Sequence, residues 1–182
     1  MSLIVCFSGK IGSGKSSVLT AISEKLHWKR TGFGDYLRAE IAKAGGDPSS
    51  REALQDKGRR LVESDPDGFC RAVLAYGDYQ AGDNLFVDGV RHVDIFNLLK
   101  RIAAPADVRL IFLSVTDDVQ LSRVTTRSDS DDLVRAVGHT VELDLTESLP
   151  QWADANIDAD QPFDDVVASC IHTIQSWIKN DP

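Results

Sequence analysis

The eight residues Gly9-Lys10-Ile11-Gly12-Ser13-Gly14-Lys15-Ser16 fit the spacing G-x-x-x-x-G-K-[ST], which is typical of a loop that cradles phosphate groups. Glycines let the main chain curl tightly, so that backbone N–H groups approach phosphate oxygens where a Cβ would obstruct them. The ammonium group of Lys15 can reach the β- and γ-phosphates, and the Ser16 hydroxyl can complete the ligand shell of Mg²⁺. The sequence therefore predicts a nucleoside triphosphate site formed by Gly9, Lys10, Ile11, Gly12, Ser13, Gly14, Lys15, Ser16 and Ser17.

The segments on either side of this loop favour the same interpretation. The spacing alone would arise by chance in about one in a hundred chains of this length. Here the apolar run Leu3–Ser8 predicts a buried strand before the loop, and helical spacing begins at Lys15. A helix that begins there adds the positive end of its dipole to the phosphate site.

A second candidate for metal binding is Asp88, which ends the short apolar run Leu85–Val87. A carboxylate at the end of a strand near the phosphate loop can hold Mg²⁺ directly or through a water molecule. The alternative is an ordinary turn residue, because Asp-Gly is a common turn dipeptide. We predict that Ser16 and Asp88 together form the metal site.

The elements that must position these residues alternate between short apolar runs and longer amphipathic segments. Strands are predicted at Leu3–Ser8, Trp28–Phe33, Leu85–Val87, Val108–Val115 and Ala155–Ile157. Helices are predicted at Lys15–Leu26, Asp35–Ala44, a segment capped by Ser49 and Glu52 and ending near Ser64, Asp67–Tyr76, Val93–Ala103, Asp117–Arg127 and Phe163–Ile178. This alternation indicates an α/β fold with a parallel sheet, in which ligands bind beyond the carboxyl ends of the strands.

Composition excludes several classes of protein. The 182 residues suit a single domain spanning 1–182, and the net charge of −8 argues against binding to a nucleic acid polymer or an anionic membrane surface. Three scattered cysteines without a CxxC pair indicate small core residues in a reducing cytosol, so we expect a cytoplasmic protein. The first residues lack the basic start of a signal peptide. The histidines show no metal-ligand spacing.

Three further segments resemble the adenylate kinase and nucleoside monophosphate kinase family. Gly34-Asp35-Tyr36-Leu37-Arg38 resembles the G-D-x-L-R stretch of that family, and Asp88-Gly89-Val90-Arg91 resembles its D-G-x-x-R segment, shortened by one residue. Arg123-Val124-Thr125-Thr126-Arg127 is similar to the R-x-x-x-R that opens the family's lid. The three segments also follow one another in the family's order.

Other segments are similar to smaller relatives within this group. Arg51–Gly58 (REALQDKG) resembles the R-x-x-L-Q-x-x-G of phage-type deoxynucleoside monophosphate kinases. Arg127–Asp132 and Ala153–Ile157 are similar to compact-lid relatives, including dephospho-CoA-kinase-like proteins. The chain has neither the long lid insertion of the classical enzymes nor a cysteine quartet.

The resemblance implies a three-layer P-loop fold with five parallel strands in the adenylate kinase order, helices on both faces and a compact lid. It implies an acceptor-binding part over about 35–80 and a short lid over about 123–135. Arg38 and Arg91 would bind the acceptor phosphate, while Arg123 and Arg127 would close over the transferring phosphoryl group. Gln55 lies in the segment that would also contact the acceptor.

The residue types agree with these implied roles, because phosphoryl transfer needs alignment and neutralised charge more than covalent chemistry. Guanidinium groups bind phosphate through paired hydrogen bonds, and Arg123 and Arg127 share one face of a helix. As alternatives, Arg38 could be a solvated helix residue paired with an acid, and Arg91 could cap a turn. Arg123 and Arg127 could be a surface pair. Asp35 has three interpretations: an N-cap, an acceptor-binding residue, or a base toward a hydroxyl group.

These predictions lead to one main function and two alternatives. The main hypothesis is a kinase that uses ATP and Mg²⁺ to phosphorylate a small phosphorylated acceptor, with a nucleoside or deoxynucleoside monophosphate as the first choice. The first alternative is phosphorylation of a hydroxyl group, as in dephospho-CoA kinase. The second is a nucleotide-binding switch, although the chain lacks both N-K-x-D and L-S-G-G-Q. The sequence leaves open whether the protein is a monomer or a homodimer.

Overall fold

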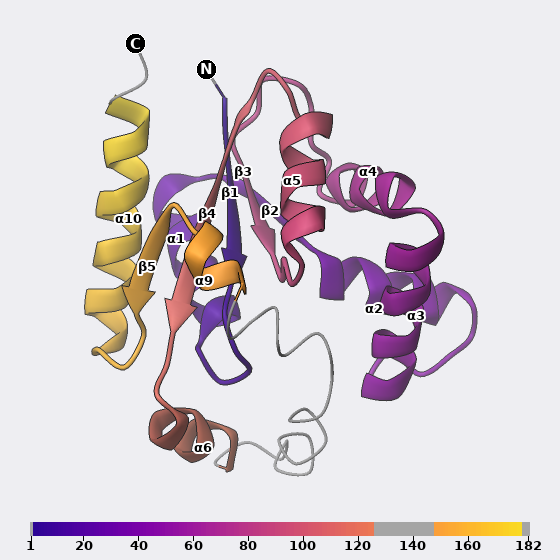
Figure 1. Cartoon of the computed structure of the whole chain (residues 1–182), viewed down its shortest axis with the longest axis horizontal. Coiled ribbons are helices and arrows are strands. Elements are labelled where there is room, and N and C mark those ends of the chain that lie inside the picture. Colours follow the sequence, from indigo (N-terminus) through magenta and orange to yellow (C-terminus); the bar gives the residue numbers. More distant parts are fainter. Residues whose placement is uncertain (1, 126–147, 180–182) are drawn as a thin grey trace.

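The computed structural model describes residues 2–125 and 148–179, and its centre is a sheet of five parallel strands (Figure 1). The strands are β1 (Leu3–Ser8), β2 (Lys29–Gly32), β3 (Leu85–Asp88), β4 (Asp107–Ser114) and β5 (Ala155–Asp158). Their order across the sheet is β2-β3-β1-β4-β5, with every neighbouring pair parallel. This confirms the predicted five-stranded sheet and its strand order.

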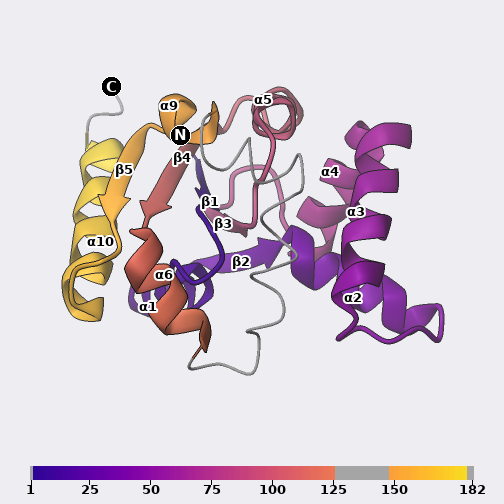
Figure 2. The ribbon, with the colours of Figure 1, turned by 60° about the horizontal axis from the view of Figure 1, so that its bottom comes forward.

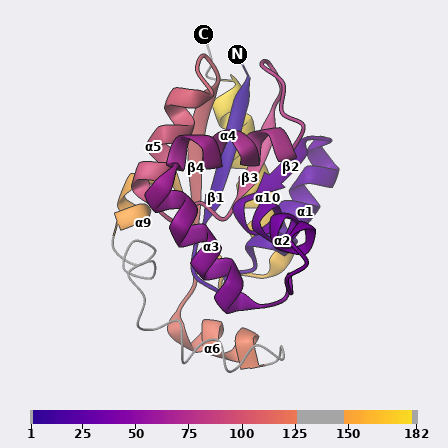
Figure 3. The same cartoon turned by 90° about the vertical axis from the view of Figure 1, so that its right-hand side faces the viewer.

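Helices cover both faces of the sheet and make a three-layer structure (Figure 3). One face packs against α1 (Lys15–Leu26) and α10 (Phe163–Lys179). The other packs against α2 (Phe33–Lys43), α4 (Pro66–Tyr76), α5 (Val93–Ile102) and the short α9 (Leu149–Trp152), with α3 (Arg51–Ser64) alongside. The helix α6 (Asp117–Thr125) lies beyond the end of β4 (Figure 1).

The central strand β1 shows why the sequence forms this arrangement. Ile4 and Cys6 point into the core on the α4–α5 side, while Val5 and Phe7 point into the core on the α1–α10 side. Each of these side chains is fully buried. A strand covered on both faces needs a continuous apolar run, which is what Leu3–Phe7 supplies.

Two predicted helix starts differ from the structure. The cap of α3 is Ser50, whose hydroxyl accepts a hydrogen bond from the Ala53 amide at 3.2 Å, whereas Ser49 is bonded to the Asp47 carboxylate. The helix α2 begins at Phe33 with Gly32 as its N-cap, so of the three interpretations of Asp35 the N-cap is wrong and the other two stay predictions. Gly32 is also the last residue of β2, which is shorter than the predicted Trp28–Phe33.

One element was absent from the sequence prediction altogether. The helix α9 has four residues and packs Leu149 into the core. A segment this short contains barely one turn, so helical periodicity cannot reveal it. The predicted end of α6 at Arg127 and the loop at 128–132 lie outside the described residues.

All three cysteines are buried and free of disulfide bonds, as predicted. Burial raises the pKa of each thiol, which keeps it protonated and unreactive. Within residues 2–125 and 148–179, no helix combines the length and the apolar character needed to cross a bilayer.

Candidate active site

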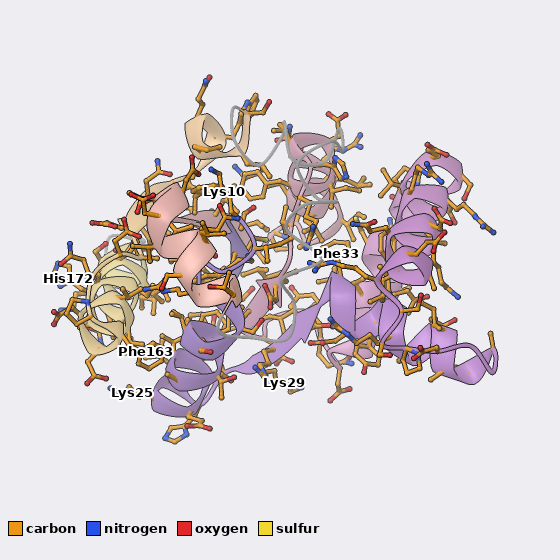
Figure 4. The ribbon with its side chains drawn as sticks, turned by 90° about the horizontal axis from the view of Figure 1, so that it is seen from below. Lys10, Lys25, Lys29, Phe33, Phe163 and His172 are labelled. Carbon is orange, nitrogen blue, oxygen red and sulfur yellow. The ribbon has the colours of Figure 1, made fainter. Side chains whose placement is uncertain are left out.

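The parallel strands end at one edge of the sheet, and the register brings the predicted site residues to that edge. Asp88 pairs with Phe7 of β1 on one side and with Gly32 of β2 on the other. Figure 4 looks onto this edge, where Lys10 and Phe33 lie toward the middle of the molecule and Lys25 and His172 toward its periphery. The phosphate loop, Asp88 and the start of α2 are therefore neighbours in space.

The phosphate loop has the backbone geometry that its glycines predict. Gly9, Gly12 and Gly14 have φ values of 141°, 81° and 81°, a region that side chains disfavour. A Cβ on Gly9 would also collide with the carbonyl oxygen of Leu113. Gly14 caps α1 without a side-chain hydrogen bond, so the first N–H groups of the helix stay available to an anion.

The ammonium group of Lys15 is held inside the curl of this loop. Its Nζ donates to the carbonyl oxygens of Gly9 at 2.6 Å and Lys10 at 3.0 Å, and to the Ser13 hydroxyl at 3.3 Å. The positive charge therefore lies at the centre of the loop, where donor phosphates are expected. The side chain of Lys10 points elsewhere and pairs with Asp117 of α6 at 2.9 Å.

The carboxylate of Asp88 faces the phosphate loop. The Ser16 hydroxyl donates to Oδ2 of Asp88 at 3.2 Å, while the amides of Gly89 and Val90 anchor the following turn to the Phe7 carbonyl. The other carboxylate oxygen, Oδ1, is buried and has no hydrogen-bond partner among the described residues. A buried oxygen without a partner is costly, so its presence calls for an explanation such as a bound ion.

The electrostatic surroundings of Asp88 support the same conclusion. Burial raises the pKa of its carboxyl group, and repulsion from Asp35 adds to the rise, while Lys15, Ser16 and Arg91 oppose it. Mg²⁺ binds hard oxygen ligands and favours the ionised carboxylate. The Ser16 hydroxyl and the partnerless Oδ1 are therefore a donor set that fits Mg²⁺.

Of the predicted acceptor residues on α2, Asp35 lies beside Gly32, which Asp88 also approaches. A Cβ placed on Gly32 would lie 3.2 Å from Cβ of Asp88 and 3.3 Å from Oδ2 of Asp35, so both carboxylates flank this glycine. Asp35 accepts a hydrogen bond from the Arg38 guanidinium at 3.2 Å. Both side chains are largely open to solvent, Arg38 at 53% and Asp35 at 61%.

Arg123 reaches the phosphate loop from α6. Its guanidinium donates to the Ala159 carbonyl at 2.8 Å and to the Gly12 carbonyl at 3.5 Å. It thus lies beside the loop in contact with main-chain oxygens, and its role over the phosphoryl group stays a prediction. Arg127 lies outside the described residues.

The remaining predicted residues are less closely connected to this centre. Gln55 lies on an exposed position of α3, and Ser17 is exposed on the first turn of α1. Gln55 therefore stays a prediction. The structure adds residues that the sequence did not suggest: Asp117 as the partner of Lys10, the carbonyl of Ala159, and Gly32 between the two carboxylates. None of these three had been singled out by a sequence pattern, because Gly32 falls within the predicted strand Trp28–Phe33 and the other two contacts join residues far apart in sequence.

Comparison with known protein sequences gives a matching family and similar adenylate kinases. Residues 5–142 match the family described as AAA domain, AAA_18. The chain is 28% identical over 151 residues to an adenylate kinase of Stenotrophomonas maltophilia (strain R551-3), covering 78% of this chain and 79% of that enzyme. It is 23% identical over 126 residues to an adenylate kinase of Rickettsia bellii (strain RML369-C), covering 69% of this chain and 58% of the length of that enzyme.

Solved structures share the fold at lower identity. A gluconokinase from Sinorhizobium meliloti 1021 superposes with a TM-score of 0.59 at 20% identity, covering 98% of this chain and 94% of that protein. At this low sequence identity, the similarity shows a shared fold and does not show a shared activity.

Proposed function

The chain belongs to the AAA domain family AAA_18 and is a P-loop protein of the nucleoside monophosphate kinase type, and from this premise we propose that it transfers the γ-phosphoryl group of ATP to a nucleoside or deoxynucleoside monophosphate. The observation that carries the proposal is the position of Asp88. Its carboxylate lies between the phosphate loop, through Ser16, and the start of α2, through Gly32 and Asp35. A donor and an acceptor bound on these two sides would meet at Asp88.

On the donor side, this chain's own groups would neutralise the phosphates. The loop amides and the α1 N-terminus would bind phosphate oxygens, and Lys15 would exchange its contacts with loop carbonyls for contacts with the β- and γ-phosphates. Ser16 and Asp88 would hold Mg²⁺. When bound there, Mg²⁺ would supply positive charge that offsets the negative charge of the donor phosphates.

On the acceptor side, Arg38 and Arg91 would bind the phosphate of the monophosphate. Arg91 lies three residues after Asp88 and within electrostatic reach of its carboxylate. Arg38 can turn from Asp35 to an incoming phosphate at small cost, because an ion pair this exposed contributes little to stability. Arg123 and Arg127 would shield the charge that develops on the phosphoryl group.

The experiment is a coupled assay of ADP release with ATP and Mg²⁺ over nucleoside monophosphates, their deoxy forms and dephospho-CoA. We expect release to depend on one or more monophosphates and to be lost in Lys15→Ala. ATP binding without consumption under any of these conditions would contradict the proposal and favour a nucleotide-binding switch.

A second candidate is transfer to a hydroxyl group. It is favoured by one observation, the approach of Asp35 to Asp88 across Gly32, which would let Asp35 accept a proton from a hydroxyl nucleophile. The variant Asp35→Asn separates the two. A phosphate acceptor needs no base, so the loss should stay within about tenfold, whereas loss of a general base costs about 10²–10⁴-fold.

A further inference from the structure

A hollow of about 480 Å³ runs along the outer face of α5, and none of its lining residues belongs to the phosphate loop. Small-molecule sites commonly enclose about 300–1,000 Å³. Figures 1 and 2 show α5 between α9 on one side and the α3–α4 pair on the other. The walls accordingly come from three regions, with Val62 and Pro66 opposite Trp152. We call this hollow the α5 groove.

The α5 groove begins where the proposed acceptor site ends. His92, which follows Arg91 directly, lines the groove together with Val93 at the start of α5. A ligand whose phosphate is bound by Arg91 would therefore have the groove within reach of its remaining atoms.

The floor of the groove carries two opposite charges on one helix face. Asp94, Leu98 and Arg101 all line it and are spaced i, i+4 and i+7 along α5. Neither Asp94 nor Arg101 makes a hydrogen bond or ion pair within the described part of the chain. Leu98 lies between them and is buried.

The two charges lie along the length of the groove. Positions seven residues apart are about 10 Å apart along a helix axis, so a ligand lying along α5 meets a carboxylate that accepts hydrogen bonds at one end and a guanidinium that donates them at the other. On the opposite wall, Trp152 is 53% exposed and offers an aromatic face for stacking.

We propose, as an extension of the proposed function, that the α5 groove holds the base of the acceptor monophosphate and that this base is guanine. Guanine presents ring and amino N–H donors beside the acceptors O6 and N7. Asp94 accepts from the N–H edge, Arg101 donates to O6 and N7, and Trp152 stacks on the ring. Adenine lacks the O6 acceptor, and a pyrimidine is too small to meet both charges.

Kinetics with Asp94→Asn and Trp152→Ala test this assignment. Both variants are expected to raise KM for GMP or dGMP by about 10- to 100-fold, the discrimination of one well-formed base contact, while KM for ATP changes less than twofold. The control is Glu24→Gln, an exposed carboxylate on α1. Unchanged KM for GMP in both variants, or a wild-type preference for AMP or a pyrimidine monophosphate, would overturn the assignment.

A binding experiment separates failure of this inference from failure of the proposed function. GMP added without ATP is expected to quench tryptophan fluorescence in the wild type and in Trp177→Phe, but not in Trp152→Phe. Quenching by GMP in a protein that transfers no phosphoryl group would support the groove and contradict the kinase. ATP consumption stimulated by monophosphates, with quenching unaffected by Trp152→Phe, would support the kinase and contradict the groove.

Discussion

The lysine of the phosphate loop is bound by main-chain oxygens, whereas the arginine of α2 contacts a carboxylate on its own helix. Lys15 donates to two carbonyls and a hydroxyl within a loop whose glycines have positive φ. Arg38 makes one 3.2 Å contact with Asp35, and both side chains lie largely in solvent. On the proposed donor side the lysine is thus held by the backbone of its own loop, whereas the proposed acceptor side presents exposed side chains.

This difference indicates which part of the site tolerates substitution and which part does not. A backbone cradle recognises phosphate, which every nucleoside triphosphate carries, and it tolerates little change because its geometry needs glycine at defined positions. Exposed side chains on helices can be exchanged without disturbing the core. If the proposal is right, the fold can keep one donor site while the acceptor-binding side chains differ.

The largest effect is expected from Lys15→Ala on the donor side. Removing the charge at the centre of the loop should lower kcat by about 10³-fold, because a preorganised charge that stabilises the transition state contributes on this scale. ADP release measures the loss. Lys25→Ala, at the exposed end of the same helix, is the matched control and should retain full activity. Equal losses in both variants would contradict the donor role of Lys15.

Asp88→Asn is expected to lower activity and raise stability. Activity should fall by about 10²-fold because the amide binds Mg²⁺ poorly. The variant should unfold at a higher temperature than the wild type in the absence of nucleotide and metal at pH 7, because the cost of burying an ionised carboxylate disappears. Differential scanning calorimetry measures this change. A lower unfolding temperature would show that the Ser16 contact outweighs burial.

The contribution of Asp88 to folding stability depends on pH with a defined sign. The pKa of Asp88 is raised in the folded protein, so the native state binds more protons than the unfolded state between the ordinary pKa of 3.8 and the raised value. The contribution of Asp88 to stability is therefore fully present below pH 3.8 and is lost as pH rises through the raised pKa. Subtracting the Asp88→Asn profile from the wild-type profile isolates this contribution.

On the acceptor side, Arg38→Lys is expected to raise KM for the monophosphate by about 10- to 30-fold while KM for ATP stays unchanged. A lysine keeps the charge but loses the paired hydrogen bonds to phosphate. Steady-state kinetics with each substrate varied in turn measures the two constants. The control is Arg59→Lys on α3, which is paired with Asp56. A rise in KM for ATP in place of the acceptor would contradict the division into two sides.

Gly32→Ala tests the boundary between the two sides. The backbone of Gly32 is extended, at φ −161°, so alanine is allowed there, but its Cβ would press on Asp88 and Asp35 at 3.2 and 3.3 Å. We expect kcat/KM to fall by about three- to tenfold, because a few tenths of an ångström of displacement disturb alignment. Circular dichroism and the unfolding temperature should stay near wild type. Full activity would mean that the two carboxylates need not keep their positions.

The difference between the glycine loop and the side chains around it also explains how much of the molecule could be predicted from the sequence. The central strand and the phosphate loop depend on local signals, the apolar run Leu3–Phe7 and the glycine spacing, whereas the strand order was implied by the resemblance to adenylate kinases; the structure confirms the strand, the loop geometry and the order. The N-cap of α2 was missed because Asp is a common cap, while here Gly32 takes that position. The contact between Arg123 and the carbonyls of Gly12 and Ala159 joins residues far apart in sequence, and no local pattern encodes it.

The smallest effect is expected at an exposed ion pair beside the phosphate loop. Lys10 pairs with Asp117 at 2.9 Å, and the aspartate is 88% exposed. If the backbone dominates the donor side, Asp117→Asn should weaken ATP binding by no more than about threefold, since exposed ion pairs contribute about 0–1 kcal/mol. Raising the salt concentration should reduce the difference further, because mobile ions screen exposed charges. Titration calorimetry at low and high salt measures both effects. A larger, salt-resistant loss would mean that α6 orders the phosphate loop through this exposed ion pair.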